Sequence, residues 1–240
     1  MDFSTIKGVI FDYGGTLDTN GRHWAYVLWE GYVSANIPIT EEAFRDAYVS
    51  GERALAKEPI VCPEDNFHTV LVKKVREEMK ALFDSGQWLA DEHLRQIKTI
   101  EVADFCYRYV LRNLENSRAV LKKLKSRYPL VLVSNFYGNI EAILKDFELD
   151  FFDAVIESAV VGVRKPDPEI YRLGVEAMGS EASDIIVIGD SYDKDIVPAK
   201  NVGCKTIWLK GQSWKKESVD ESIPDVIVSD INQLIVLLIG

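Results

Sequence analysis

Six short apolar segments recur along the chain, and each ends in polar residues or glycine. They occupy residues 9–11, 130–133, 154–156, 185–188, 206–209 and 226–228. Nearly all are apolar throughout, which is typical of strands that helices cover on both faces of a parallel sheet. Segments of helical length lie between or after them, at residues 118–126, 139–147, 168–178, 193–202 and 230–238. This alternation predicts an α/β fold built on a doubly wound parallel sheet.

The segment from about residue 21 to residue 112 interrupts that alternation. It contains no convincing strand pattern, and its apolar residues recur at helical spacing. The clearest run is Phe67, Val70, Leu71, Val75, Met79 and Leu82. Thr40 and Asp91 each precede acidic residues, which predicts two helix N-caps. We therefore expect one domain of residues 1–20 and 113–240 and an inserted α-helical domain of residues 21–112.

The chain has 240 residues, of which 47% are hydrophobic, and this is enough apolar material for one sizeable core or two smaller ones. No apolar run approaches the ~18 residues that a membrane-spanning helix needs. The first predicted strand is not preceded by a basic region or followed by a small-residue cleavage site. These features predict a cytoplasmic protein.

The formal net charge of -10 repels phosphate backbones and anionic lipids. Neither nucleic acid nor a membrane is therefore an expected partner. The adjacent lysines Lys215 and Lys216 do not form a basic patch, because Glu217, Asp220 and Glu221 offset them.

Four groups of polar residues follow predicted strands, at the places where a parallel α/β sheet binds its ligands. They are Asp12-Tyr13-Gly14-Gly15-Thr16, Ser134-Asn135, Lys165-Pro166-Asp167, and Gly189-Asp190 with Asp195. Each group alone is a common turn, helix cap or loop. Their combination, in this order and at strand ends, is a specific signal of an active site.

Asp12, Asp190 and Asp195 are expected to converge, and three like charges stay ionised together only if a cation neutralises them. An all-oxygen ligand set selects a hard ion, and Mg²⁺ usually takes a few carboxylates, water and a phosphate oxygen. We expect Asp12 and Asp190 to bind Mg²⁺ directly, with the backbone carbonyl of Gly14 as a third ligand. Asp195 is expected to support this metal site from behind the direct ligands.

The four groups resemble the four motifs of the haloacid dehalogenase superfamily, a phosphatase-rich group of hydrolases with an aspartate nucleophile. The resemblance covers residues 5–20 and 115–235. It implies a Rossmann-like core, and it identifies the helical insertion as a C1-type cap domain.

The resemblance also implies catalytic roles for individual residues. Asp12 would be the nucleophile, and Asp190 would complete a Mg²⁺ site. Ser134 and Lys165 would bind the transferring group. The charge of Lys165 can also spread over an anionic transition state and keep Asp12 deprotonated, so we expect Lys165 to be catalytic.

Four residues near the predicted nucleophile, including Ser134, are expected to contact the substrate. The hydroxyl of Ser134 can donate to phosphoryl oxygens, and Asn135 follows it directly. Gly15 allows the chain to turn tightly beside the nucleophile. Thr16 can orient Asp12 through a hydrogen bond.

One position departs from the pattern of the superfamily. Its phosphatases carry a second aspartate two residues after the nucleophile, which protonates the leaving group and activates water, but Gly14 occupies that position here. General acid–base catalysis contributes typically ~10²- to 10⁴-fold to a rate. Ordinary alkyl phosphate esters are therefore expected to be poor substrates unless Asp18 or a cap residue supplies the proton. His23 is a residue of the insertion that could reach the active site, because it follows the first motif at the place where the cap begins.

The sequence leaves three functions open. We favour a Mg²⁺-dependent hydrolase of a small anionic, phosphorylated metabolite with a good leaving group, such as an acyl phosphate or pyrophosphate. The second possibility is a 2-haloacid dehalogenase, or a phosphonate hydrolase, which needs a cap lysine that Lys57 and Lys73 do not clearly provide. The third is a catalytically weak relative that binds a phosphorylated ligand or a protein. A monomer and a dimer both remain open.

Overall fold

The computed structural model describes residues 3–214 and 218–240, so Lys215, Lys216 and Glu217 lie outside the described residues. It contains a six-stranded parallel sheet in the order β3-β2-β1-β4-β5-β6. The strands are β1 (Gly8–Phe11), β2 (Leu130–Ser134), β3 (Ala154–Glu157), β4 (Ile185–Gly189), β5 (Lys205–Leu209) and β6 (Val226–Val228). Each matches a predicted strand to within one residue at either end, so the predicted α/β fold is confirmed.

The helices fall into a group before β2 and a group that alternates with the later strands. The first group is α1 (Trp24–Ser34), α2 (Glu41–Lys57), α3 (Phe67–Asp84) and α4 (Glu92–Lys125). The second is α5 (Ile140–Asp146), α6 (Ser158–Val161), α7 (Glu169–Met178), α8 (Val197–Val202) and α9 (Gln233–Leu238), with short helical turns at Ala182–Asp184 and Tyr192–Ile196. Among the described residues, no helix is both long and apolar enough to cross a membrane.

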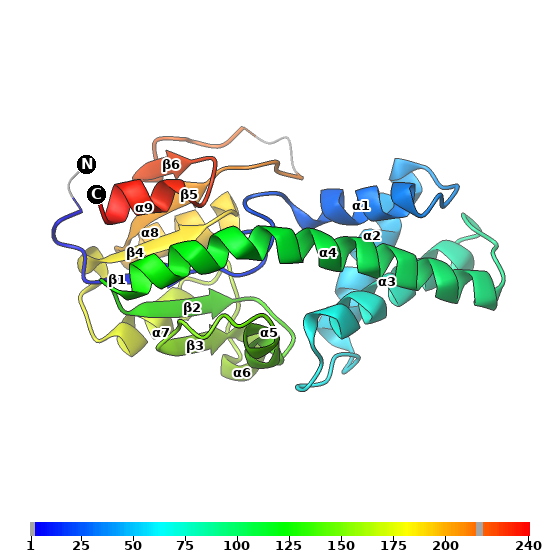
Figure 1. The fold of residues 1–240 in the computed structure, drawn as a ribbon, viewed down its shortest axis with the longest axis horizontal. Helices are drawn as coiled ribbons and strands as arrows, with labels where there is room; N and C mark the ends of the chain where they lie inside the picture. Colours follow the sequence, from blue (N-terminus) through cyan, green and yellow to red (C-terminus); the bar gives the residue numbers. More distant parts are fainter. Residues whose placement is uncertain (1–2, 215–217) are drawn as a thin grey trace.

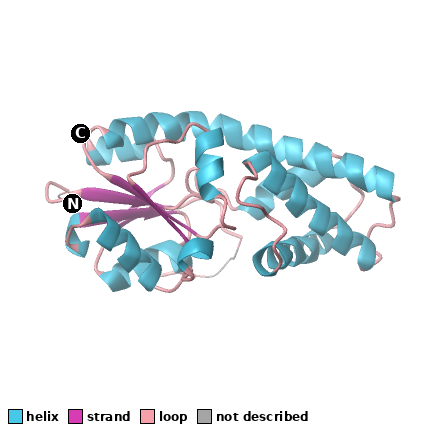
Figure 2. Cartoon of the chain, turned by 90° about the horizontal axis from the view of Figure 1, so that it is seen from below, coloured by secondary structure: helices cyan, strands magenta, loops and turns pink. Residues whose placement is uncertain are grey.

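The central strand β1 shows why the strand segments are apolar throughout. Ile10 pairs with Val131 of β2 and Val187 of β4, and these three side chains belong to one buried cluster with residues of α7 and α8. Val9 and Phe11 point to the opposite face, in a second cluster with residues of α4, α5 and α9. Because helices cover both faces (Figure 2), every side chain of β1 is buried.

The inserted segment is helical, as predicted, and lies beyond the carboxyl ends of the strands (Figure 1). The predicted N-caps are confirmed, because Thr40 accepts a hydrogen bond from Ala43 N–H (3.2 Å) and Asp91 accepts one from Leu94 N–H (2.8 Å). We call α1, α2, α3 and the first part of α4 the cap, and the sheet with its flanking helices the core.

Helix α4 differs from the prediction in length. The sequence predicts a helix at residues 118–126, but these residues are the end of a single 34-residue helix. This helix passes without a break through residue 113, where the sequence places the domain boundary. The division into two domains stays a prediction. The hydroxyl of Ser117 donates to the carbonyl oxygen of Leu17 (2.6 Å), so α4 is bonded to the loop that follows β1.

Two other predicted helices start differently. Residues 193–202 form a π-helical turn followed by the short helix α8. The last helix starts at Gln233, not at Asp230, because the carboxylate of Asp230 accepts the N–H of Asn232 (2.8 Å) in a local turn. Such side-chain bonds to the backbone compete with helical hydrogen bonds.

Leu114 and Leu111 on α4 provide a test of how α4 packs in the protein interior. Leu114 is fully buried, whereas Leu111 is 41% exposed. Leu114→Ala is expected to lower the free energy of unfolding by about 2–5 kcal/mol, because it leaves a cavity. Leu111→Ala is expected to change it by about 0.5 kcal/mol or less. Chemical denaturation measures both values, and equal losses would contradict this packing.

Candidate active site

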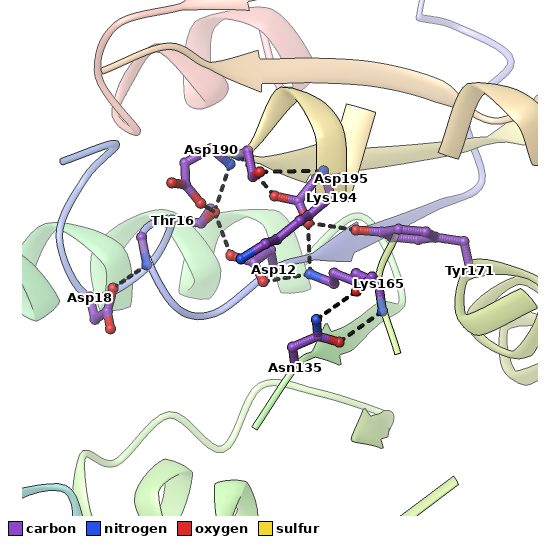
Figure 3. Close-up of polar contacts among 11 residues, drawn as sticks. Asp12, Thr16, Asp18, Asn135, Lys165, Tyr171, Asp190, Lys194 and Asp195 are labelled. Carbon is purple, nitrogen blue, oxygen red and sulfur yellow. Dashed lines mark hydrogen bonds and ion pairs between the residues drawn. The ribbon is translucent and has the colours of Figure 1, made fainter. Parts of the chain in front are cut away.

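Asp12 follows the last residue of β1, and its side chain is almost buried. Its N–H donates to the carbonyl oxygen of Ile188 (2.9 Å), which continues the pairing of β1 with β4 and fixes the backbone. Thr16 Oγ1 donates to Asp12 Oδ2 (2.9 Å), and Lys165 Nζ donates to Asp12 Oδ1 (2.5 Å). Both oxygens of the predicted nucleophile are therefore held by neighbouring side chains (Figure 3).

Lys165 joins two carboxylates in the interior. Its ammonium donates to Asp12 and to Asp195 Oδ1 (2.7 Å), and only 2% of its side chain is exposed. Asn135 holds the backbone of Lys165 by accepting its N–H (2.9 Å) and donating to its carbonyl oxygen (3.0 Å). Burial alone would lower the pKa of Lys165, but the two carboxylates raise it above its ordinary value. Lys165 therefore stays protonated.

Both carboxylate oxygens of Asp195 accept hydrogen bonds from the protein. Its Oδ1 accepts from Lys165 and from the hydroxyl of Tyr171 (2.8 Å), and its Oδ2 accepts from the N–H of Ser191 (2.9 Å). A side chain on Gly189 would overlap the carboxylate of Asp195, so the strand end must carry glycine there. These bonds make Asp195 the anchor of Lys165.

Asp190 follows β4 and lies against the loop that carries Asp12. Its N–H donates to Thr16 Oγ1 (3.0 Å), and its Oδ1 lies 3.2 Å from the same hydroxyl. The indole of Trp208 donates to the backbone carbonyl of Asp190 (2.8 Å). Gly15 has φ +98, and a Cβ there would overlap the Asp190 carboxylate. Thr16 and Gly15 thus let Asp12 and Asp190 approach each other.

Three carboxylates meet at this edge of the sheet. Asp12, Asp190 and Asp195 each offer an oxygen within 4.8 Å of the others. Burial raises the pKa of Asp12 to about 6, and the charge of Asp195 adds to this rise although Lys165 opposes it. Burial and the charge of Asp12 raise the pKa of Asp190 well above its ordinary value. The negative charges of these buried carboxylates destabilise one another, and all the ligand atoms are oxygens. Both features fit a hard divalent cation.

The predicted substrate-binding residues lie in this region, but several of their polar groups already have partners in the chain. The N–H of Gly15 donates to Asp18 Oδ1 (2.7 Å), Thr16 is bonded to both Asp12 and Asp190, and Asn135 holds the backbone of Lys165. Ser134 is buried at the end of β2. Substrate binding by these four residues stays a prediction.

Both carboxylate oxygens of Asp18 have partners within the chain. Its Oδ1 accepts from Gly15, and its Oδ2 accepts from the indole of Trp24 (2.9 Å). Burial raises the pKa of Asp18 to about 7, although both donors lower it. Through these two bonds, Asp18 links the loop after β1 to Trp24 at the start of α1. Around Gly14 itself, an added Cβ would meet no atom within 4 Å.

The cap brings its own charges to the interface with the core. Lys74 of α3 is buried and forms an ion pair with Glu52 of α2. The hydroxyl of Tyr137, from the core loop after β2, donates to Glu52 (3.3 Å). Burial alone would raise the pKa of Glu52, but Lys74 and the core residue Lys194 hold it below its ordinary value. Glu52 raises the pKa of Lys74 well above its ordinary value, although burial opposes this.

His23 caps a helix in this structure. Its Nδ1 accepts the N–H of Ala25 (3.2 Å) at the start of α1. Burial lowers the pKa of His23 to about 4, and the nearby ammonium groups of Lys194 and Lys74 lower it further. His23 is therefore neutral near neutral pH.

The sequence did not single out Tyr171, although it bonds Asp195. Tyr171 lies on α7 between other buried residues such as Ile170 and Gly174, so its position looks like ordinary core packing. Only the three-dimensional structure shows that its hydroxyl donates a hydrogen bond to Asp195. Trp208 was missed for the same reason, because it belongs to the apolar run of β5.

The family of the chain follows from a comparison with known proteins. Residues 6–203 match the model of the family described as haloacid dehalogenase-like hydrolase. The chain belongs to this family. This match confirms the resemblance that the four motifs indicated.

Relatives and solved structures add detail. The glyceraldehyde 3-phosphate phosphatase of Pyrococcus abyssi is 37% identical over 103 residues, which are 42% of this chain and 43% of that protein, so the chain matches less than half of that relative. The enzyme of the same name from Methanothermobacter thermautotrophicus is 26% identical over 238 residues, covering 95% of this chain and 98% of that protein. A dehalogenase crystallised with an intermediate complex has a TM-score of 0.66 and 17% identity over 98% of both chains, which shows a shared fold.

The raised pKa of Asp12 has a consequence for stability. Between its ordinary value of 3.8 and about 6, the folded protein keeps a proton that the unfolded chain has lost. The free energy of unfolding of the metal-free protein therefore falls as pH rises through this window. Asp12→Asn cannot ionise, so it is expected to melt a few degrees above the unsubstituted protein near neutral pH.

Thermal melts of the metal-free protein from about pH 4 to 7 measure this difference. Asp193→Asn is a matched control, because Asp193 is exposed on the same helical turn as Asp195. An Asp12→Asn protein that melts lower than the unsubstituted protein near neutral pH contradicts the raised pKa.

Proposed function

We propose that this chain is a Mg²⁺-dependent phosphoryl hydrolase that uses Asp12 as its nucleophile on a small phosphorylated substrate. The proposal is supported mainly by the buried carboxylate of Asp12, which is bonded to Lys165 and grouped with Asp190 and Asp195. This arrangement supplies a nucleophile, a permanent positive charge and oxygen ligands for a cation at one edge of the sheet.

The reaction has two displacement steps. In the first, an oxygen of Asp12 forms a bond to phosphorus while the bond from phosphorus to the leaving oxygen breaks. In the second, water attacks phosphorus and the Asp12 carboxylate departs, which releases phosphate. Lys165 offsets negative charge on Asp12 and on the phosphoryl oxygens in both steps, and the hydroxyl of Ser134 donates to one of these oxygens.

The cation would be held by Asp12, Asp190 and the backbone carbonyl of Gly14, with Asp195 behind them. When bound, Mg²⁺ neutralises the carboxylates and polarises the phosphoryl oxygen. Thr16 keeps Asp12 and Asp190 at the spacing that a shared ion requires. Asp195 keeps Lys165 beside the nucleophile.

The absence of a side chain at Gly14 limits the leaving group. The two nearby candidates for a replacement acid, Asp18 and His23, are turned to other partners. The carboxylate of an acyl phosphate and the phosphate of a pyrophosphate are leaving groups that need no protonation, so we propose these compounds as the preferred class of substrate. The relatives named glyceraldehyde 3-phosphate phosphatase make triose phosphates the ester substrates to compare.

Two alternatives have weaker support. A phosphonate hydrolase of this family needs a neutral cap lysine to form a Schiff base, but Lys74 is paired with Glu52 and its pKa is raised. A dehalogenase works without a metal, and the grouping of Asp190 with Asp12 favours a cation.

Phosphate release from acetyl phosphate tests the nucleophile and the metal together. We expect turnover with Mg²⁺, none with a chelator, and a loss of about 10³-fold or more in Asp12→Asn, because no carboxylate is left to attack. Asp193→Asn is expected to keep the activity of the unsubstituted protein. Turnover that survives in Asp12→Asn, or that ignores the chelator, would falsify the mechanism.

Gly14→Asp tests the leaving-group argument. A side chain fits at Gly14, because an added Cβ meets no atom within 4 Å and the residue does not have a positive φ. The new carboxyl is expected to raise the hydrolysis of glyceraldehyde 3-phosphate by about 10-fold or more relative to acetyl phosphate. Gly14→Asn has nearly the same shape without an acid and should give no such gain. An equal gain in both variants would show that proton donation is not the cause.

A further inference from the structure

A core loop lies against the chain segment that enters the cap. Residues 210–214 follow β5, and the carbonyl oxygen of Gln212 accepts the N–H of His23 (3.1 Å). A side chain on Gly211 would overlap the backbone of Gly21. Loop and linker are therefore in direct backbone contact, which leaves room for glycine alone at that position of the loop.

The same loop inserts an aromatic ring between cap side chains. The indole of Trp214 stacks on the imidazole of His23, with ring centroids 5.7 Å apart and planes 12° apart. The ring of Tyr26 meets it edge-on at 5.4 Å, and the ring of Tyr48 lies at 5.9 Å. The guanidinium of Arg45 lies 3.9 Å from the Trp214 centroid. Four residues of the cap and its entry thus form a seat for one residue of the core.

This seat lies at the junction between the cap and the catalytic edge of the sheet. The imidazole of His23 is close enough to Lys194 and Lys74 for both ammonium groups to act on its pKa. Lys194 directly precedes Asp195, and Tyr48 is one helical turn from Glu52 on α2. A shift of the seat would therefore move the cap charges that face the core.

We propose that Trp214 is a positioning residue that holds α1 and α2 against the core and so determines how well the site between them retains its substrate. Stacking and cation–π contacts act only at short range, so they hold α1 and α2 only in the position seen here. The kinetic part of this inference rests on the proposed function. The role of Trp214 in holding the cap rests on its contacts with cap residues and does not depend on catalysis.

Kinetics of Trp214→Ala and Trp214→Phe test the proposal. With acetyl phosphate, Trp214→Ala is expected to raise KM by about 5- to 20-fold and to change kcat by less than about 3-fold. Trp214→Phe keeps a ring in the seat and is expected to recover most of the loss. Trp29→Ala is the control, because Trp29 packs on Phe44 inside the cap (5.3 Å). The same KM rise in Trp29→Ala would reduce the effect to cap stability and overturn the proposal.

Hydrogen exchange gives a readout that does not need turnover. In Trp214→Ala, the His23 amide and those of α1 are expected to exchange faster, while those of α3 stay unchanged. Unchanged exchange at His23 would show that Trp214 does not tie the cap, whatever the kinetics. If the unsubstituted protein releases no phosphate from any substrate, the proposed function fails, and exchange alone decides the role of Trp214.

Discussion

The positive charge of Lys165 is the constraint on which the arrangement of carboxylates at the strand ends depends. Its side chain and that of Asp195 are each 2% exposed, and that of Asp12 is 8% exposed. A buried carboxylate without a partner costs several kcal/mol, so two of them at the end of a sheet require this ammonium. The same charge holds together three chain segments: the end of β1, the loop before α7 and the turn after β4.

The order of the strands explains why such distant residues meet. β1 lies between β2 and β4, so the residues that follow these strands share one edge. Asp12 follows β1, Asp190 follows β4, and Ser134 ends β2. Because all strands run parallel, the helices cover the faces and leave this edge to the loops and the cap. The topology gathers the charges, and hydrogen bonds such as those of Thr16 then set their distances.

The strands and this convergence were accessible from the sequence because they have local signals. Apolar runs mark strands that are buried on both faces, and the polar residues after them mark the edge of the sheet at which the carboxylates meet. The full length of helix α4 could not be predicted from the sequence. Its buried positions follow helical spacing from Thr99 to Leu124, but sequence spacing does not say that one stripe packs first on the cap and then on the sheet. Tyr171 and Trp214 contact partners far away in the chain, which no local pattern reveals.

Helix α4 also has a mechanical consequence. At about 1.5 Å per residue, its 34 residues span roughly 51 Å, and its sequence contains neither proline nor glycine, the usual causes of a sharp kink. A helix without such a residue bends gently along its whole length. Its C-terminal part is bonded to the loop after β1 through Ser117, so a small tilt of this part would displace the N-terminal end of the helix by a larger distance.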